Sequence, residues 1–175
     1  TALTLGADGW IDQARRAPSP NCDAQTEPPH LLVIHHISLP PGQFAGHDIE
    51  RLFTNTLPAE GHPDYSWISQ LRVSAHWLIR RDGELVQFVS ASQRAWHAGA
   101  SCWRGRQTCN DFSLGVELEG TATAEADEDL AFAKLFAAAY PRAGRAREAH
   151  GQAHRHQRCG RRPDRRRRRE CTLAL

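Results

Sequence analysis

A four-residue apolar run, Leu31–Ile34, most constrains the fold, because it leads without a break into His35 and His36. Turn residues follow at once, in the Pro-Pro-Gly sequence of residues 40–42. A short apolar run bounded by turn residues is typical of a strand buried on both faces, so we predict such a strand over residues 31–37. Its two terminal imidazoles are either metal ligands or hydrogen-bonded residues at the rim of the core, and the run alone favours the second interpretation.

Hydrophobic periodicity and turn residues predict the other elements. The chain has 175 residues, of which 40% are hydrophobic and 24% charged, an ordinary composition for one globular domain. We predict short helices over 8–16 and 48–54, a hairpin over 74–89 with a type I′ turn at Asp82-Gly83, a strand over 112–120 and an amphipathic helix over 123–140. No apolar run approaches the ~20 residues that span a membrane, so no membrane partner is expected.

The strand over 112–120 alternates strictly, and Glu117 lies on its polar face beside Gly115. A carboxylate there either faces bulk water or lines a cleft. In a cleft it can serve as the general base toward a metal-bound water. A cysteine nucleophile, Cys102 or Cys109 paired with a histidine, is a less favoured alternative because no spacing supports it.

Histidines provide the candidate zinc ligands. They are His35, His36, His76 and His97, with His150, His154 and His156 near the C-terminus, where Asp164 adds a carboxylate. Neither an HExxH sequence nor a CxxC pair is present. Any metal site must therefore be assembled from distant parts of the chain.

The last fifth of the chain differs in charge from the rest. Residues 1–140 carry a net charge of −7 and residues 141–175 a net charge of +9, with five consecutive arginines at 165–169. So polar a segment cannot bury enough apolar surface to fold alone, and we expect residues 142–175 to be disordered. Arginine runs can bind nucleic acid through phosphates, but without interleaved aromatic residues we expect no nucleic-acid partner.

Seven sequence motifs stand in one order within residues 8–121. They are LLVIH at 31–35, ISLPPG at 37–42, RVSAH at 72–76, LIRRDGE at 78–84, RAWHAG at 94–99, CNDFS at 109–113 and ELEG at 117–120. With them the chain resembles the 1,6-anhydro-N-acetylmuramyl-L-alanine amidases, the cytoplasmic branch of the zinc N-acetylmuramoyl-L-alanine amidases, whose fold is shared with peptidoglycan recognition proteins.

The resemblance implies a single α/β domain over residues 1–141, with a central mixed β-sheet flanked by helices. It implies a Zn²⁺ ion held by two histidines and an aspartate, and hydrolysis of the amide between anhydro-muramic acid and L-alanine of the stem peptide. The expected partner is a small anhydro-muropeptide, and the expected state is a cytoplasmic monomer. The odd number of cysteines, five, also favours a reducing compartment, and residues 1–10 lack the pattern of a signal peptide.

Residue by residue, the resemblance implies that His35 is the first zinc ligand. Glu117 activates the zinc-bound water and passes its proton to the leaving amine. Arg72 and Trp96 match positions in the substrate groove. His36 replaces an expected asparagine, where a second imidazole would crowd the zinc or alter the groove.

Residues 142–175 depart from the family pattern. Their spacing offers substitutes: His154 and Asp164, ten residues apart as in the family, as the other zinc ligands, and Arg162 in place of the lysine that steadies the oxyanion. The change of composition near Pro141 favours another hypothesis, a reading-frame shift in GC-rich DNA. Translation of the neighbouring frame tests it, and a chain without these ligands would be a non-catalytic muropeptide-binding module.

Overall fold

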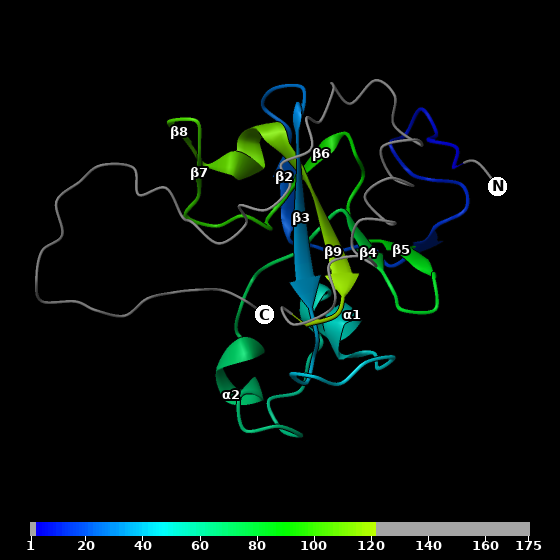
Figure 1. Ribbon diagram of the computed structural model, residues 1–175, viewed down its shortest axis with the longest axis vertical. Coiled ribbons are helices and arrows are strands. Elements are labelled where there is room, and N and C mark those ends of the chain that lie inside the picture. Colours follow the sequence, from blue (N-terminus) through cyan, green and yellow to red (C-terminus); the bar gives the residue numbers. More distant parts are fainter. Residues whose placement is uncertain (1–2, 122–175) are drawn as a thin grey trace, which may run out of the picture.

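The computed structural model describes residues 3–121, which form a five-stranded mixed β-sheet (Figure 1). The strands lie in the order β1 (Arg15–Arg16), β5 (Leu85–Gln87), β4 (Trp77–Ile79), β9 (Ser113–Glu119) and β3 (Leu31–Ile37). Only the β4–β5 pair is antiparallel; the other three pairs are parallel. The central mixed sheet expected from the sequence is therefore confirmed.

Smaller elements surround this sheet. They are the antiparallel pair β2 (Cys22–Ala24) and β6 (Gln93–Ala95), the hairpin β7 (Cys102–Trp103) and β8 (Arg106–Gln107), the helices α1 (Asp48–Phe53) and α2 (Tyr65–Ile68), and the 3₁₀ helix η1 (Cys109–Phe112). The predicted helix over 48–54 is confirmed as α1. The predicted helix over 123–140 and the tail over 142–175 lie outside the described residues. No helix within residues 3–121 is long and apolar enough to cross a membrane.

β9 is the most enclosed strand of the sheet, because every one of its seven residues is buried. It pairs with β3 on one side and β4 on the other (Figure 1). The apolar side chains of its alternating pattern, at Leu114, Val116 and Leu118, join a core cluster with Ile11 and Trp77. Its opposite face carries Glu117 and is equally buried, so that face does not meet bulk water.

β3 forms over the predicted residues, but its predicted burial on both faces is wrong for the described structure. Within residues 3–121 it is an edge strand that pairs only with β9, and the side chain of Ile34 is 45% exposed. An apolar run predicts a strand, but it does not predict whether that strand lies at the centre or at the edge of the sheet.

The hairpin of β4 and β5 is confirmed, but its predicted type I′ turn is wrong. A type I′ turn needs positive φ at both central residues, whereas only Gly83, at φ 88°, has it here. The Gly83 N–H donates to the Arg80 carbonyl (2.9 Å) and the Arg80 N–H to the Glu84 carbonyl (2.9 Å). These bonds define a type I turn centred on Arg81 and Asp82, followed by a left-handed glycine that matches the strand twist.

The predicted helix over residues 8–16 is also wrong. Leu5 and Ile11 form a β-bridge there, and Gly9 has a φ of 78°. The buried side chain of Gln87 holds this segment, accepting the Ile11 N–H (2.8 Å) and donating to the Gly9 carbonyl (2.9 Å). Tertiary hydrogen bonds to a neighbouring strand thus override a weak helical pattern.

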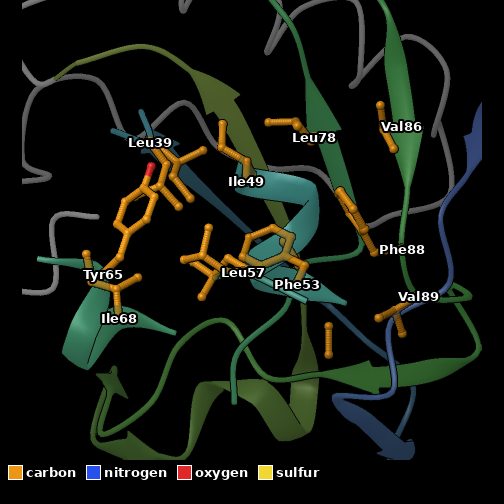
Figure 2. Close-up of a cluster of buried hydrophobic side chains, with 14 residues drawn as sticks. Leu39, Ile49, Phe53, Leu57, Tyr65, Ile68, Leu78, Val86, Phe88 and Val89 are labelled. Carbon is orange, nitrogen blue, oxygen red and sulfur yellow. The ribbon is translucent and has the colours of Figure 1, made fainter. Parts of the chain in front are cut away.

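α1 covers one face of the sheet and anchors the larger core cluster (Figure 2). Its buried residues Ile49, Leu52 and Phe53 pack with residues of β4 and β5, and the rings of Phe53 and Phe88 meet edge-to-face at 5.0 Å. Arg80 ties the helix to the sheet, since its guanidinium forms ion pairs with Glu50 of α1 and with Glu119 of β9.

Candidate active site

His35 and Glu117 are brought together by the pairing of β3 with β9. The two residues are direct partners in the parallel register, so their side chains lie on the same face of the sheet. Glu117 is 7% exposed, and its Oε2 has no hydrogen-bond partner among the described residues. Burial raises the pKa of Glu117 to about 8. A carboxyl that titrates near neutral pH is suited to transfer protons in both directions.

His35 is kept neutral at the same place. Burial is the main cause that lowers its pKa to about 4, and the nearby His36 contributes to the same direction. A neutral imidazole retains a lone pair on one ring nitrogen, as a metal ligand requires. The structure therefore pairs a candidate ligand with a candidate base.

His97 completes a compact group with these two residues. Its Nδ1 lies 3.0 Å from His35 Nε2, and its Nε2 lies 3.2 Å from Ser113 Oγ. Burial, followed by the proximity of His35 and His76, lowers the pKa of His97 well below its usual value. No proton chemistry is predicted for His97 from the sequence, although a glycine inside a strand, Gly115, is a signal of close approach by another group.

Gly115 is the residue that admits the His97 ring. A Cβ placed on Gly115 would lie 2.6 Å from both Cδ2 and Nδ1 of that ring, closer than non-bonded atoms approach. We expect Gly115→Ala to expel the imidazole or strain β9, and to lower the free energy of unfolding by ~2 kcal/mol. Denaturant unfolding measures the loss, and the same substitution at Gly46, whose site is open, is the control. Unchanged stability together with an unchanged His97 NMR signal would contradict the packing.

His76 has a structural role beneath the group. It is fully buried, its Nδ1 accepts the Gly115 N–H (3.0 Å), and its Nε2 lies 3.0 Å from the Gln93 carbonyl, to which it donates. Burial lowers its pKa to about 4, against the opposing effect of the Gln93 carbonyl. Both ring nitrogens are thus used, and they join the start of β4 to β9 and to the first residue of β6.

Acid should therefore destabilise the fold through His76. Its pKa is about 4 when folded and near 6.5 when unfolded, so the unfolded chain binds the proton first as the pH falls. The stability is complete above pH 6.5 and is lost progressively down to pH 4, by ~3 kcal/mol from this residue. Urea unfolding at half-unit pH steps measures the slope. His76→Gln cannot titrate and should show a shallower slope, and equal slopes would contradict the assignment.

The other predicted site residues lie further from this group. Strand alternation places His36 on the opposite face of β3 from His35. Arg72 is exposed, and its guanidinium donates to the Leu71 carbonyl (3.1 Å). Trp96 is half-buried and directly precedes His97, with its N–H donating to Ser74 Oγ (3.0 Å). No hydrogen bond within residues 3–121 joins these side chains to His35 or Glu117.

The described residues offer part of a zinc site. Within residues 3–121 no three histidine, cysteine, aspartate or glutamate side chains are grouped to hold a metal ion, whereas catalytic zinc usually has three protein ligands. His35 fits a first ligand, and the partnerless Oε2 of Glu117 fits an adjacent base. The other predicted residues, His154, Arg162 and Asp164, lie outside the described part of the chain.

Comparisons with known proteins identify the family of this chain. The sequence profile of the N-acetylmuramoyl-L-alanine amidase family matches residues 25–167. The 1,6-anhydro-N-acetylmuramyl-L-alanine amidase AmpD of Citrobacter freundii is 58% identical over 118 residues, which cover 66% of this chain and 63% of that protein. The AmpD of Salmonella typhimurium (strain LT2) is 52% identical over 140 residues, covering 76% of this chain and 75% of that protein.

A solved structure shares the fold. The crystal structure of a selenomethionine derivative of AmpD matches with a TM-score of 0.71 and 50% identity, over 79% of this chain and 81% of that one. The chain spans under two thirds of the length of the Citrobacter freundii relative, but three quarters of the Salmonella one. Since the family profile also matches most of the sequence, the chain belongs to the N-acetylmuramoyl-L-alanine amidase family.

Proposed function

We propose that this chain is a zinc-dependent amidase that hydrolyses the amide between (anhydro-)N-acetylmuramic acid and L-alanine in peptidoglycan fragments. The observation that carries the proposal is the pairing of His35 with Glu117, a neutral imidazole beside a buried carboxyl with a partnerless oxygen. Membership of the family, and the activity named for AmpD at 58% identity, support the substrate.

Three residues would hold the metal: His35, with His154 and Asp164 from the part of the chain that is not described. When bound, zinc supplies a Lewis acid that polarises the amide carbonyl and acidifies a water molecule. The pKa of Glu117, about 8 in the metal-free chain, would fall beside a bound divalent cation because the opposite charge would stabilise the carboxylate. Glu117 is then ionised and ready to accept a proton at neutral pH.

Glu117 moves one proton through the reaction. Its carboxylate takes the proton from the attacking water as the oxygen bonds to the carbonyl carbon. It returns that proton to the amide nitrogen as the C–N bond breaks, which leaves a lactyl carboxylic acid and the free amine of L-alanine. Arg162, two residues before Asp164, is assigned to the developing oxyanion.

Substrate binding is assigned to residues that flank this centre. Trp96 directly precedes His97, and Arg72 presents an exposed guanidinium suited to an acidic stem peptide. His36 acts from the opposite face of β3, where its proximity helps to lower the pKa of His35. Working in the cytoplasm as a monomer, the enzyme needs neither nucleic acid nor a membrane.

The amidase domain is assigned to residues 1–141 and the arginine-rich tail to 142–175. The family match continues to residue 167 and so includes His154, Arg162 and Asp164, which supports drawing the remaining ligands from the tail. A tail read in a shifted frame would leave His35 without its partners. The substitutions His154→Ala and Asp164→Ala distinguish a tail that supplies zinc ligands from one that does not. If both variants bind as much zinc as the parent chain, neither residue is a ligand.

Metal analysis and a cleavage assay on the full chain test the function. About one equivalent of zinc and release of the stem peptide from an anhydro-muropeptide are expected, and His35→Ala should abolish both. His47→Ala, on an exposed histidine beside Glu50, is the matched control. Muropeptide binding without zinc and without cleavage would instead identify a binding module.

A further inference from the structure

We propose that His97 is a positioning residue that fixes the tautomer of His35, so that Nδ1 of His35 is the atom left to meet a metal ion. The consequence for metal binding rests on the proposed amidase function, whereas the tautomer belongs to the metal-free chain. The inference follows from a chain of hydrogen bonds that runs from Ser113 through His97 to His35.

Ser113 sets the direction of this chain. Its hydroxyl donates to the Cys109 carbonyl at 2.6 Å, which uses its only hydrogen. Toward His97 Nε2, 3.2 Å away, the same oxygen can only accept. The hydrogen between these two atoms must therefore be on His97 Nε2.

The second step passes from His97 to His35. A neutral imidazole has one N–H and one lone pair, so His97 with a proton on Nε2 has its lone pair on Nδ1. Nδ1 lies 3.0 Å from His35 Nε2, which must supply the hydrogen. His35 then carries its proton on Nε2 and its lone pair on Nδ1. Both residues are half-buried, and no carboxylate of residues 3–121 hydrogen-bonds to either ring, which favours the neutral forms.

Three further contacts fix the His97 ring in the required place. Gly115 leaves room where any Cβ would overlap the ring. Asn110 Oδ1 accepts the backbone N–H groups of His97 (3.1 Å) and Ala98 (2.8 Å). His76 packs edge-on against the ring at a centroid distance of 5.9 Å. The RAWHAG and CNDFS motifs and Gly115 therefore act together to hold the His97 ring against His35.

Such an arrangement is what a metal-binding histidine requires from its surroundings. When the second nitrogen donates to a fixed partner, the tautomer and the ring plane are set before the metal arrives, and loss of that partner typically costs 10–100-fold in metal affinity. In this chain the fixed partner of His35 is the imidazole of His97. The hydrogen bond between His97 and Ser113 leaves Nδ1 of His97 as the acceptor.

Long-range ¹H–¹⁵N NMR of the metal-free full chain tests the tautomer directly. We expect His35 and His97 both to show protonated Nε2 and unprotonated Nδ1 at neutral pH. A proton on His35 Nδ1, with the lone pair on Nε2, overturns the proposal. Because the experiment needs neither zinc nor substrate, it decides the proposal even if the chain proves inactive.

Two substitutions at His97 separate positioning from packing. His97→Asn keeps a carbonyl oxygen near the place of Nδ1, so His35 should retain its tautomer and most of its zinc affinity. His97→Ala removes the acceptor, so His35 should become a tautomer mixture and bind zinc ~10–100-fold more weakly in competition with a chromophoric chelator. His47→Ala should match the parent chain. Equal tautomer ratios in the Asn and Ala variants, or a parental His35 spectrum in a folded Ala variant, overturn the proposal.

Discussion

Glu117→Gln is expected to slow amide hydrolysis by ~10³-fold, because glutamine cannot accept the proton of the attacking water or return it to the leaving amine. The zinc content should not change, since His35 and its proposed partners are intact. Steady-state cleavage of an anhydro-muropeptide and metal analysis of the same sample measure the two effects. Unchanged turnover would show that Glu117 is not the group that transfers the proton.

The same substitution should stabilise the metal-free chain at alkaline pH. The pKa of Glu117 is about 8 when folded and near 4.3 when unfolded, so the unfolded chain releases the proton first as the pH rises. The destabilisation caused by this buried carboxyl is absent below pH 4.3 and grows as the pH rises to 8, where it reaches ~5 kcal/mol. Glutamine is uncharged at every pH, so the variant is not destabilised in this way.

Denaturant unfolding of both chains between pH 5 and 9 in a metal chelator measures the stability difference. It should widen as the pH rises, with the variant more stable. Glu60→Gln changes an exposed glutamate and should follow the parent chain at every pH. A difference that does not depend on pH would show that Glu117 is ionised in the folded chain, contrary to the assignment.

Arg80→Met is expected to lower the free energy of unfolding by ~3–5 kcal/mol, the usual cost of leaving a buried charge without its partner. Arg80 is 6% exposed, donates to the Gly46 carbonyl (2.8 Å), and pairs with Glu119 and with Glu50 of α1. Its loss leaves the carboxylate of Glu119 in the core without its arginine partner and removes one of the ion pairs between α1 and the sheet. Chemical denaturation and thermal melting measure the effect.

A second substitution isolates the electrostatic part of this loss. Adding Glu119→Gln to Arg80→Met removes the stranded charge while keeping an oxygen to accept the Ala45 N–H (2.8 Å). The double variant should recover part of the stability lost by the single one. Arg51→Met breaks an exposed ion pair with Asp48 and should cost under ~1 kcal/mol. If the two arginine variants lose equal stability, burial of Arg80 is not the cause.

The strand that carries the site could be predicted from sequence because its pattern is local. The alternation over residues 112–120 places Glu117 opposite the apolar face of β9, and burial of that face follows from the sheet. The contact between His35 and His97 could not be predicted, because it depends on the register of β3 with β9 and on a loop that crosses Gly115. Neither is a property of any single stretch of sequence.

The errors at the hairpin turn and the N-terminal segment have the same origin. Asp82-Gly83 suits two turn types, and the bonds from Arg80 select the one in which only Gly83 is left-handed. Residues 8–16 have a weak helical pattern, and Gln87 from another strand supplies the hydrogen bonds that decide their path. In both places, contacts distant in sequence outweigh local preference.

The parallel pairing of β3 with β9 also bears on when the site forms. β3 follows β1 and β2, and β9 is the last strand of the described residues, so their ladder closes a loop that contains most of the other elements. Closing long loops is slow, because the entropy of the intervening chain is lost before the strands can pair. During synthesis, His35 leaves the ribosome long before Glu117, so the proposed pair of His35 and Glu117 cannot form until every strand of this sheet has been made.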